Sequence, residues 1–212
     1  MTDYLMLAKN GDHEIVVDRS RFICHAFRVY TVEEANHYIN DIRELHDKAN
    51  HHAVAYLIGE HNEFGRAADD GEPNKTAGAP MLEVLQRQNI RNCLVIVTRY
   101  FGGVKLGAGG LIRAYGGAVS ETLKTIGLIR RIRRQSVWLS VDYSLFDTLQ
   151  NRLKQQGYDI GQILYSERVK LETLVDIPDI EDFKRWVIEF SNDAIYLEMG
   201  GISFKELPLE TE

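Results

Sequence analysis

The order of hydrophobic and polar residues along the chain predicts short strands and helices in mixed order. Several apolar runs in the first half are rich in β-branched or aromatic residues, which is typical of strands. These runs are 15–17, 22–27, 53–58 and 93–97. Thr31, followed three residues later by Glu34, predicts a capping box and the start of a helix. Pro80 fits the first turn of another helix.

From Val137 onward the hydrophobic pattern predicts a second series of strands and helices. Val137, Leu139 and Val141 alternate with other residues, as in a strand with one buried face. The apolar periods that follow predict a helix, two strands, a helix and a strand. This is the βαββαβ order of a ferredoxin-like unit. We therefore expect an α+β protein of two domains, residues 1–135 and 136–212.

The composition is that of a soluble globular protein, with 44% hydrophobic and 26% charged residues in a chain of 212. No stretch approaches the apolar length of a membrane span, and the first residues lack the basic segment of a signal peptide. We therefore expect a cytoplasmic protein with no membrane partner. Cys24 and Cys93 both lie in apolar runs, which predicts buried free thiols.

The charge is unevenly distributed. The net charge of −6 argues against a general binder of polyanions. Between Arg99 and Arg134, however, the chain holds eight Lys or Arg and one acidic residue, Glu121. Any contact with nucleic acid is expected in this segment. The arginines at 130–134 resemble a linker or a strand edge and would extend the positive surface.

The rest of the chain is organised around a glycine-rich stretch from Thr98 to Ser120. It follows the apolar run at 93–97, holds seven glycines and leads into a helical pattern. A strand, a glycine-rich turn and a helix can present free backbone N–H groups to an anion. The glycine spacing matches neither a P-loop nor a Rossmann motif, and glycines also permit positive φ angles and close packing. The glycine pattern alone does not decide between an anion-binding turn and a purely structural role of the glycines.

A second candidate cluster lies upstream of the glycines. Asp69, Asp70 and Glu72 could hold a hard cation such as Mg²⁺, although most stretches of this kind are solvated turns. His51 and His52 are neighbours on a predicted strand and point to opposite faces, so we do not expect them to share a metal. No nucleophile–base pair and no complete set of metal ligands is visible. We therefore assign no catalytic residue and no metal site, and the sequence does not identify a cofactor.

Several motifs of the first domain together resemble one known family. They are 20–22, the segment around His51 with 55–56, 69–73, 76–78, 98–103, 105–111 and 113–115. On these residues the chain is identified as a member of the IMPACT family, in its bacterial two-domain YigZ/YvyE form. The resemblance implies an N-terminal fold similar to a domain shared by a small-subunit ribosomal protein, domain IV of elongation factor G and GHMP kinases. It implies a C-terminal domain similar to the ferredoxin-like domains of that elongation factor.

The resemblance favours a non-enzymatic RNA- or ribosome-associated factor linked to translation regulation. Basic side chains and the backbone N–H groups of the glycine-rich turn would contact phosphates, and an aromatic ring would stack on a base. The residues expected at this surface are Arg99, Tyr100 or Phe101, Lys105, Gly107, Gly109, Gly110 and Arg113. A surface of mixed charge would also suit a protein partner.

Two alternatives stay open. In the first, the chain is a phosphate-ligand or nucleotide-binding protein or an enzyme, with Asp69, Asp70 or Glu72 holding Mg²⁺. Lys105 would then lie opposite the cation, and His51 belongs to the same candidate cluster. In the second, the acidic residues and the arginines only form salt bridges that hold the domain together. Whether the acidic and glycine-rich stretches meet in space is not determined by the sequence.

Overall fold

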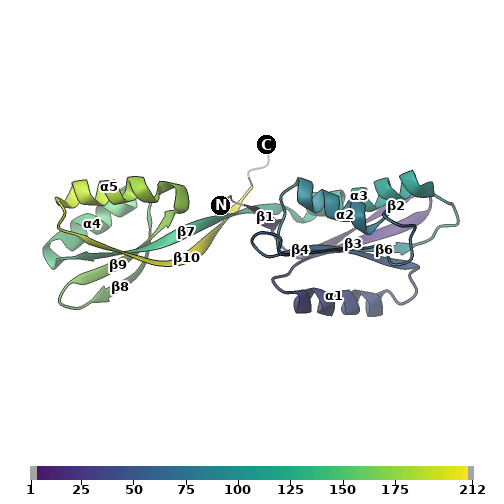
Figure 1. The fold of residues 1–212 in the computed structure, drawn as a ribbon, viewed down its shortest axis with the longest axis horizontal. Helices are drawn as coiled ribbons and strands as arrows, with labels where there is room; N and C mark the ends of the chain where they lie inside the picture. Colours follow the sequence, from purple (N-terminus) through teal and green to yellow (C-terminus); the bar gives the residue numbers. More distant parts are fainter. Residues whose placement is uncertain (1–3, 210–212) are drawn as a thin grey trace. The chain divides into compact units, whose positions relative to one another are not determined.

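A computed structural model describes residues 4–209, which fold into two units. The first unit comprises residues 4–130 with 207–209, and the second comprises residues 131–206 (Figure 1). The division falls inside one strand, β7 (Leu128–Val141), whereas the sequence analysis placed it after residue 135. The arginines at 130–134 are therefore part of a strand, and the boundary between the units falls among them.

The sheet of the first unit has five antiparallel strands in the order β2-β3-β6-β4-β5. Their bounds are β2 (Gly11–Val17), β3 (Ser20–Arg28), β4 (His51–Ile58), β5 (Phe64–Ala68) and β6 (Cys93–Tyr100). The four apolar runs predicted as strands lie within β2, β3, β4 and β6. The edge strand β5 was not predicted, because its residues are mostly exposed and carry no apolar pattern.

Helices cover both faces of this sheet (Figure 1). Their bounds are α1 (Val32–Leu45), α2 (Gly78–Arg87) and α3 (Gly107–Ile126). Ile96 of the central strand β6 belongs to the core beneath α1, whereas Val97 belongs to the core beneath α2 and α3. Successive side chains of a strand point to opposite faces. Arg99 therefore lies on the α3 side of the sheet and Tyr100 on the α1 side.

The start of α1 follows the sequence prediction. Thr31 Oγ1 accepts a hydrogen bond from the Glu34 N–H at 3.1 Å, as an N-cap residue does. The Glu34 carboxylate accepts from the Tyr30 N–H at 2.7 Å, one residue before the N–H that a capping box uses. Pro80 lies in the first turn of α2, as predicted.

The second unit has the predicted βαββαβ order. After β7 come α4 (Tyr143–Gln155), β8 (Asp159–Tyr165), β9 (Val169–Asp176), a short 3₁₀ helix (Ile177–Asp179), α5 (Ile180–Ser191) and β10 (Tyr196–Pro208). The strands of this unit run in the order β8-β9-β7, and β10 also pairs with β7. β1 (Tyr4–Leu7) belongs to the first unit and pairs with β7, the strand that begins in that unit. The predicted α+β class with a ferredoxin-like second domain is confirmed.

Arg134 does not extend a positive surface, contrary to expectation. It is buried, its Nη1 donates to the Asp159 carboxylate at 2.6 Å, and its Nε lies 3.0 Å from the Asp176 carboxylate. Hydrogen bonds from Arg134 and from Lys205 hold the pKa of the Asp159 carboxyl below its usual value. Because both carboxylates neutralise the guanidinium inside the unit, Arg134 is unsuited to bind a phosphate.

Cys24 and Cys93 are buried free thiols, as predicted. Burial raises the pKa of the Cys24 thiol to about 12 and also raises that of Cys93. Both side chains therefore stay protonated and behave as small apolar groups. Within residues 4–209 no helix is both long enough and apolar enough to cross a membrane.

Candidate functional site

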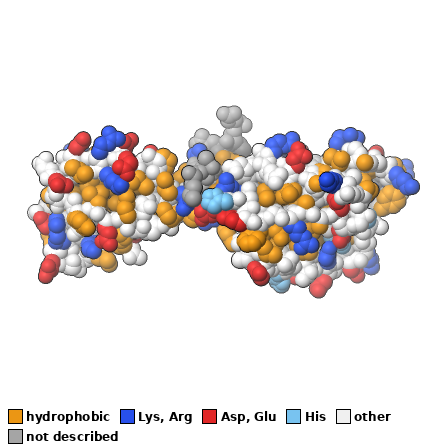
Figure 2. Space-filling view, in the orientation of Figure 1, with side chains coloured by type: hydrophobic (Ala, Val, Ile, Leu, Met, Phe, Trp, Pro, Cys, Tyr) orange, Lys and Arg blue, Asp and Glu red, His pale blue; other side chains and the backbone are white. Residues whose placement is uncertain are grey.

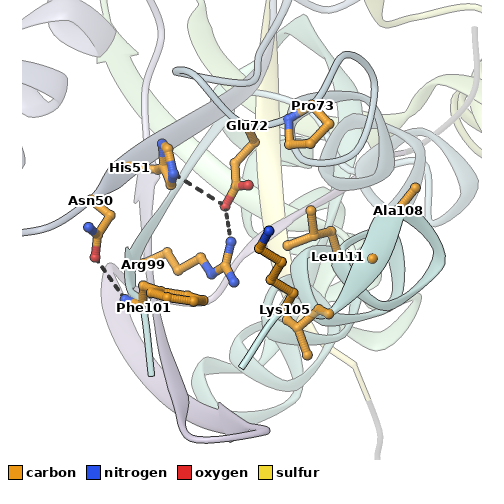
Figure 3. A pocket seen from close by; sticks show the side chains of 11 residues that line it. Asn50, His51, Glu72, Pro73, Arg99, Phe101, Lys105, Ala108 and Leu111 are labelled. Atoms are coloured by element: carbon orange, nitrogen blue, oxygen red, sulfur yellow. Dashed lines mark hydrogen bonds and ion pairs between the residues drawn. The ribbon is translucent and has the colours of Figure 1, made fainter. Parts of the chain in front are cut away.

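A cavity of about 410 Å³ opens beside the N-terminus of α3 in the first unit (Figure 3). The start of β4, the end of β6, the acidic turn (residues 69–73) and the beginning of α3 meet there. The sheet register explains part of this arrangement, because His51 on β4 pairs directly with Arg99 on β6. Glu72 of the acidic turn and Gly107 of the glycine-rich turn line the same cavity. The two candidate clusters of the sequence analysis therefore meet in space.

Arg99 and Tyr115 hold Glu72 in the wall of the cavity. Arg99 Nη1 donates to Glu72 Oε1 at 2.6 Å, and the Tyr115 hydroxyl donates to the same oxygen at 2.8 Å. Arg99 is only 5% exposed and Glu72 only 8%. Burial, together with the neighbouring carboxylate, raises the pKa of Tyr115 above its usual value. The hydroxyl therefore keeps its proton and remains a hydrogen-bond donor.

The guanidinium of Arg99 is occupied by contacts within the unit. Its Cζ lies 5.3 Å from the ring centroid of Phe22 and 5.6 Å from that of Phe101, within the range of cation–π attraction. Its Nη2 lies 3.5 Å from Ser20 Oγ. Arg99 was expected to contact phosphate directly, but it is buried and paired with Glu72. Its charge is balanced by that carboxylate, although the side chain also lines the cavity.

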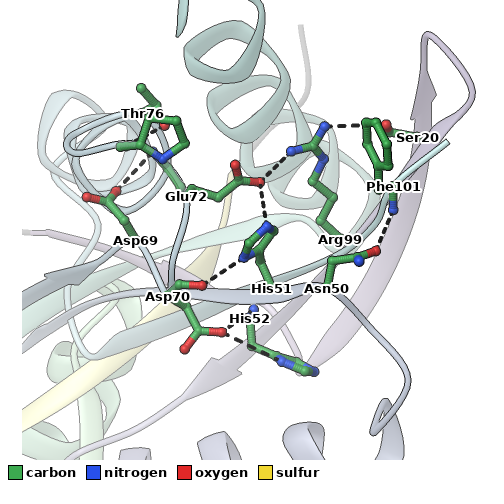
Figure 4. A network of polar contacts seen from close by, with 12 residues as sticks. Ser20, Asn50, His51, His52, Asp69, Asp70, Glu72, Thr76, Arg99 and Phe101 are labelled. Atoms are coloured by element: carbon green, nitrogen blue, oxygen red, sulfur yellow. Dashed lines mark hydrogen bonds and ion pairs between the residues drawn. The ribbon is translucent and has the colours of Figure 1, made fainter. Parts of the chain in front are cut away.

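His51 presents one ring nitrogen to the cavity (Figure 4). Its Nδ1 lies 2.8 Å from the backbone oxygen of Asp70. A carbonyl oxygen can only accept, so Nδ1 carries the hydrogen and donates it. In the neutral ring, Nε2 is then a hydrogen-bond acceptor. Nε2 lies 3.9 Å from Glu72 Oε1.

Asp69 and Asp70 have structural partners away from the cavity. Asp69 Oδ1 accepts from the N–H groups of Ala77 and Gly78 at 3.0 and 2.9 Å, which caps the start of α2. Asp70 accepts from Arg43 at 2.9 Å through Oδ1, and its Oδ2 accepts from a backbone N–H of β4. Among residues 4–209 no group of three or more His, Cys, Asp or Glu side chains could hold a metal ion. The magnesium hypothesis therefore has no set of ligands in the part of the chain that is described.

α3 starts at Gly107 without a side-chain cap. Leu106, the residue before it, makes no side-chain hydrogen bond to the helix, and the first turn contains no acidic residue. Gly107 has a φ of +65°, a conformation that favours glycine. Gly107 and Ala108 line the cavity, and N–H groups of a first helical turn have no intrahelical partner. The positive end of the helix dipole adds to the attraction for an anion here.

Lys105 is the predicted cation that fits this end of the cavity best. It is exposed and lines the cavity, and its side chain points into the space beside Arg99 and Leu111 (Figure 3). No carboxylate within residues 4–209 lies at ion-pair distance from its amino group. Its charge is therefore available to a ligand.

Four of the predicted residues lie away from this cavity. The Tyr100 hydroxyl lies 3.0 Å from His46 Nδ1 on the α1 side of the sheet. Arg113 and Gly110 line a second, smaller hollow, and Gly109 is exposed outside both. The predicted phosphate-binding set is thus divided among separate places.

Asn50 and Tyr115 were not among the predicted site residues, and Phe101 was predicted only as an alternative to Tyr100. Asn50 Oδ1 accepts from the Phe101 N–H at 2.8 Å, and both residues line the cavity. Phe101 is 47% exposed and offers its ring to the solvent side. Strand alternation could have excluded Tyr100, because it follows Arg99 and must point to the opposite face. Tyr115 lies in the motif at 113–115 and Asn50 precedes His51, so the family motifs were the only signal that could have indicated them.

Comparisons with known proteins agree with the resemblance. The model of the Impact N-terminal domain matches residues 18–123, and a domain of unknown function (DUF1949) matches residues 139–194. The IMPACT family member YvyE of Bacillus subtilis (strain 168) is 43% identical over 203 residues, which cover 96% of this chain and 94% of that protein. The IMPACT family member YigZ of Escherichia coli (strain K12) is 31% identical over 183 residues, which cover 85% and 90%.

A solved structure matches over the whole length. It is described as the crystal structure of a hypothetical protein, covers 100% of both chains, and has a TM-score of 0.60 at 29% identity. All residues that line the cavity fall inside the segment matched by the Impact N-terminal domain. The chain therefore belongs to the IMPACT family.

Proposed function

We propose that this chain binds a phosphate-bearing nucleotide in the cavity beside α3. One observation carries the proposal: Lys105 and the uncapped N-terminus of α3 line the same cavity. A lysine without an acidic partner among the described residues and a set of free N–H groups both attract an anion. Binding, and not catalysis, is proposed.

The shape and the walls of the cavity suit a single nucleotide unit. Its volume of about 410 Å³ is typical of small-molecule sites. Pro73, Leu106 and Leu111 give it apolar walls. The exposed Phe101 ring at its edge provides a face on which a base can stack. Phosphate would lie towards Lys105 and the base towards Phe101.

An RNA- or ribosome-associated role in translation regulation, in the cytoplasm, is the second candidate. Lys105, Phe101 and Arg113 are all exposed near the start of α3, which favours contact with a longer strand. Against an extended footprint, Arg99 and Arg134 are engaged in ion pairs. On the face drawn in Figure 2, the Lys and Arg side chains lie among acidic ones and do not gather into one patch. The single-nucleotide cavity therefore comes first.

Calorimetric titration at low and at physiological salt tests the proposal. The ligands are ribonucleoside monophosphates, Mg-ATP, a short 5′-phosphorylated RNA, the same RNA without the phosphate, and purified ribosomal subunits. Wild type is compared with Lys105→Ala and with Lys48→Ala, which removes an equally exposed charge outside the cavity. We expect a nucleotide to bind, Lys105→Ala to weaken it about tenfold or more, and Lys48→Ala to leave it unchanged.

The other outcomes separate the two candidates. Tighter binding of RNA than of any nucleotide, with a shallower salt slope in Lys105→Ala, would favour the RNA-associated role. No binding of any ligand at low salt would contradict both candidates. The acidic residues and arginines would then keep only their structural role.

A further inference from the structure

Glu72 offers the cavity an acceptor atom that the protein itself does not use. Its Oε1 accepts from both Arg99 and Tyr115. Its Oε2 makes no hydrogen bond to any of the described residues, although the side chain is only 3% exposed. Figure 3 shows this second oxygen turned away from Arg99, towards the side of the cavity that Pro73 lines. This oxygen is open to the cavity, where a ligand or water can donate a hydrogen bond to it.

His51 adds a second acceptor beside the first. Because Nδ1 donates to the Asp70 carbonyl, the neutral ring has its lone pair on Nε2. Nε2 lies 3.9 Å from Glu72 Oε1, so the imidazole and the carboxylate stand next to each other on one wall. Oε1 already accepts from Arg99 and Tyr115, so Nε2 and the other carboxylate oxygen, Oε2, are the two acceptors that remain for neighbouring hydroxyl groups. Neither acceptor can donate a hydrogen bond to a phosphate, so the phosphate is expected nearer to Lys105.

We propose that Glu72 and His51 bind the 2′- and 3′-hydroxyl groups of a ribose, so that the site takes ribonucleotides in preference to 2′-deoxyribonucleotides. This inference rests on the proposed function, since it concerns the sugar of the same ligand. A vicinal diol supplies two O–H donors side by side, which matches the two adjacent acceptors. A 2′-deoxyribose supplies one donor and leaves one acceptor of the wall unpaired. Sites that hydrogen-bond a ligand hydroxyl reject the analogue that lacks it for this reason.

The test compares sugar pairs that differ in one hydroxyl. The four ribonucleoside 5′-monophosphates, their 2′-deoxy counterparts and inorganic phosphate are titrated into the full chain. We expect at least one ribonucleotide to bind about tenfold or more tighter than its 2′-deoxy counterpart. In His51→Ala this ratio should shrink towards one, while the affinity for inorganic phosphate is kept. His61→Ala, an exposed histidine outside the cavity, should leave the ratio unchanged.

Glu72→Gln provides a second variant, checked for folding because Arg99 would lose its charged partner. His51→Ala removes a partly exposed side chain and keeps the test valid if Glu72→Gln fails to fold. Equal affinity of wild type for ribo- and deoxyribonucleotides would overturn this inference and leave the proposed function standing. Loss of phosphate binding in His51→Ala would also overturn it. Absence of binding to every probe would overturn the proposed function and this inference together.

Discussion

Arg99 donates to Glu72 at 2.6 Å, and both side chains are buried in the wall of the cavity. One residue comes from the end of the central strand β6 and the other from the acidic turn, 27 positions earlier in the chain. The pair therefore links the sheet to the turn that positions His51. Its contribution to folding and its role at the cavity can be separated by substitution.

Arg99→Ala is expected to destabilise the first unit by about 3–5 kcal/mol, because it leaves the Glu72 carboxylate buried without its cation. Urea unfolding measures this loss. Arg43→Ala serves as a control, since it breaks the partly exposed pair with Asp70 and should cost below about 1 kcal/mol. Equal stability of the two variants would contradict a structural role for the buried pair.

Asp69→Ala is expected to lower stability by about 1–2 kcal/mol, because the N–H groups of Ala77 and Gly78 lose their cap. Its Oδ2 also accepts from the Lys75 N–H at 2.8 Å, so the acidic turn loses a further restraint. Thermal unfolding of Asp69→Ala and of Asp47→Ala, an exposed aspartate, provides the comparison. An unchanged melting temperature in Asp69→Ala would show that the cap is dispensable.

Stability is expected to fall as the pH drops below about 6.5. Burial lowers the pKa of His25, and the nearby His46 lowers it further, although Asp12 has the opposite effect. Burial also lowers the pKa of His52. The unfolded chain then takes up protons near the ordinary histidine value of 6.5, whereas the folded chain does so only at lower pH. This stability is fully present above that value and is lost as the pH falls through the lowered pKa values.

Urea midpoints of wild type and His25→Leu across this pH range measure the effect. The variant should lose less stability between neutral and mildly acidic pH, because one of the buried histidines no longer titrates. Parallel pH profiles for the two proteins would count against a contribution from His25.

Gly117→Ala and Gly78→Ala are expected to act in opposite directions. A Cβ on Gly117 would meet no atom within 4 Å, and alanine in the middle of α3 should raise stability by about 0.5–1 kcal/mol. A Cβ on Gly78 would lie 2.4 Å from the Ala68 backbone nitrogen, so that β5 and α2 would have to move apart. Melting temperatures should therefore rise for the first variant and fall for the second. Stabilisation by both would contradict the packing described for Gly78.

Local patterns in the sequence predicted most of the fold. Thr31 and Glu34 carry the N-terminal signal of α1 in their own side chains, and the buried strand β6 is almost continuously apolar. The βαββαβ order of the second unit was predicted because each of its strands and helices has its own apolar period. β5 escaped prediction because an exposed edge strand has no apolar face to produce a pattern.

The candidate site was only partly predictable, because it depends on contacts between distant segments. Lys105 and Gly107 lie at the cavity as the glycine-rich pattern suggested. The ion pair between Arg99 and Glu72 depends on the fold of the acidic turn. No local sequence pattern predicts that fold. Tyr100 was predicted on the same surface as Arg99. It follows Arg99 directly in a strand, however, so its side chain points to the opposite face of the sheet.

Binding of a nucleotide phosphate at the first turn of α3 can be measured through amide chemical shifts. ¹⁵N-labelled protein is titrated with the ribonucleotide that binds best, and the backbone amides are followed. We expect the Gly107 and Ala108 amides to shift most, and Lys105→Ala to reduce these shifts at equal ligand concentration. Shifts concentrated elsewhere in the chain, or none at these two amides, would contradict phosphate binding at this turn.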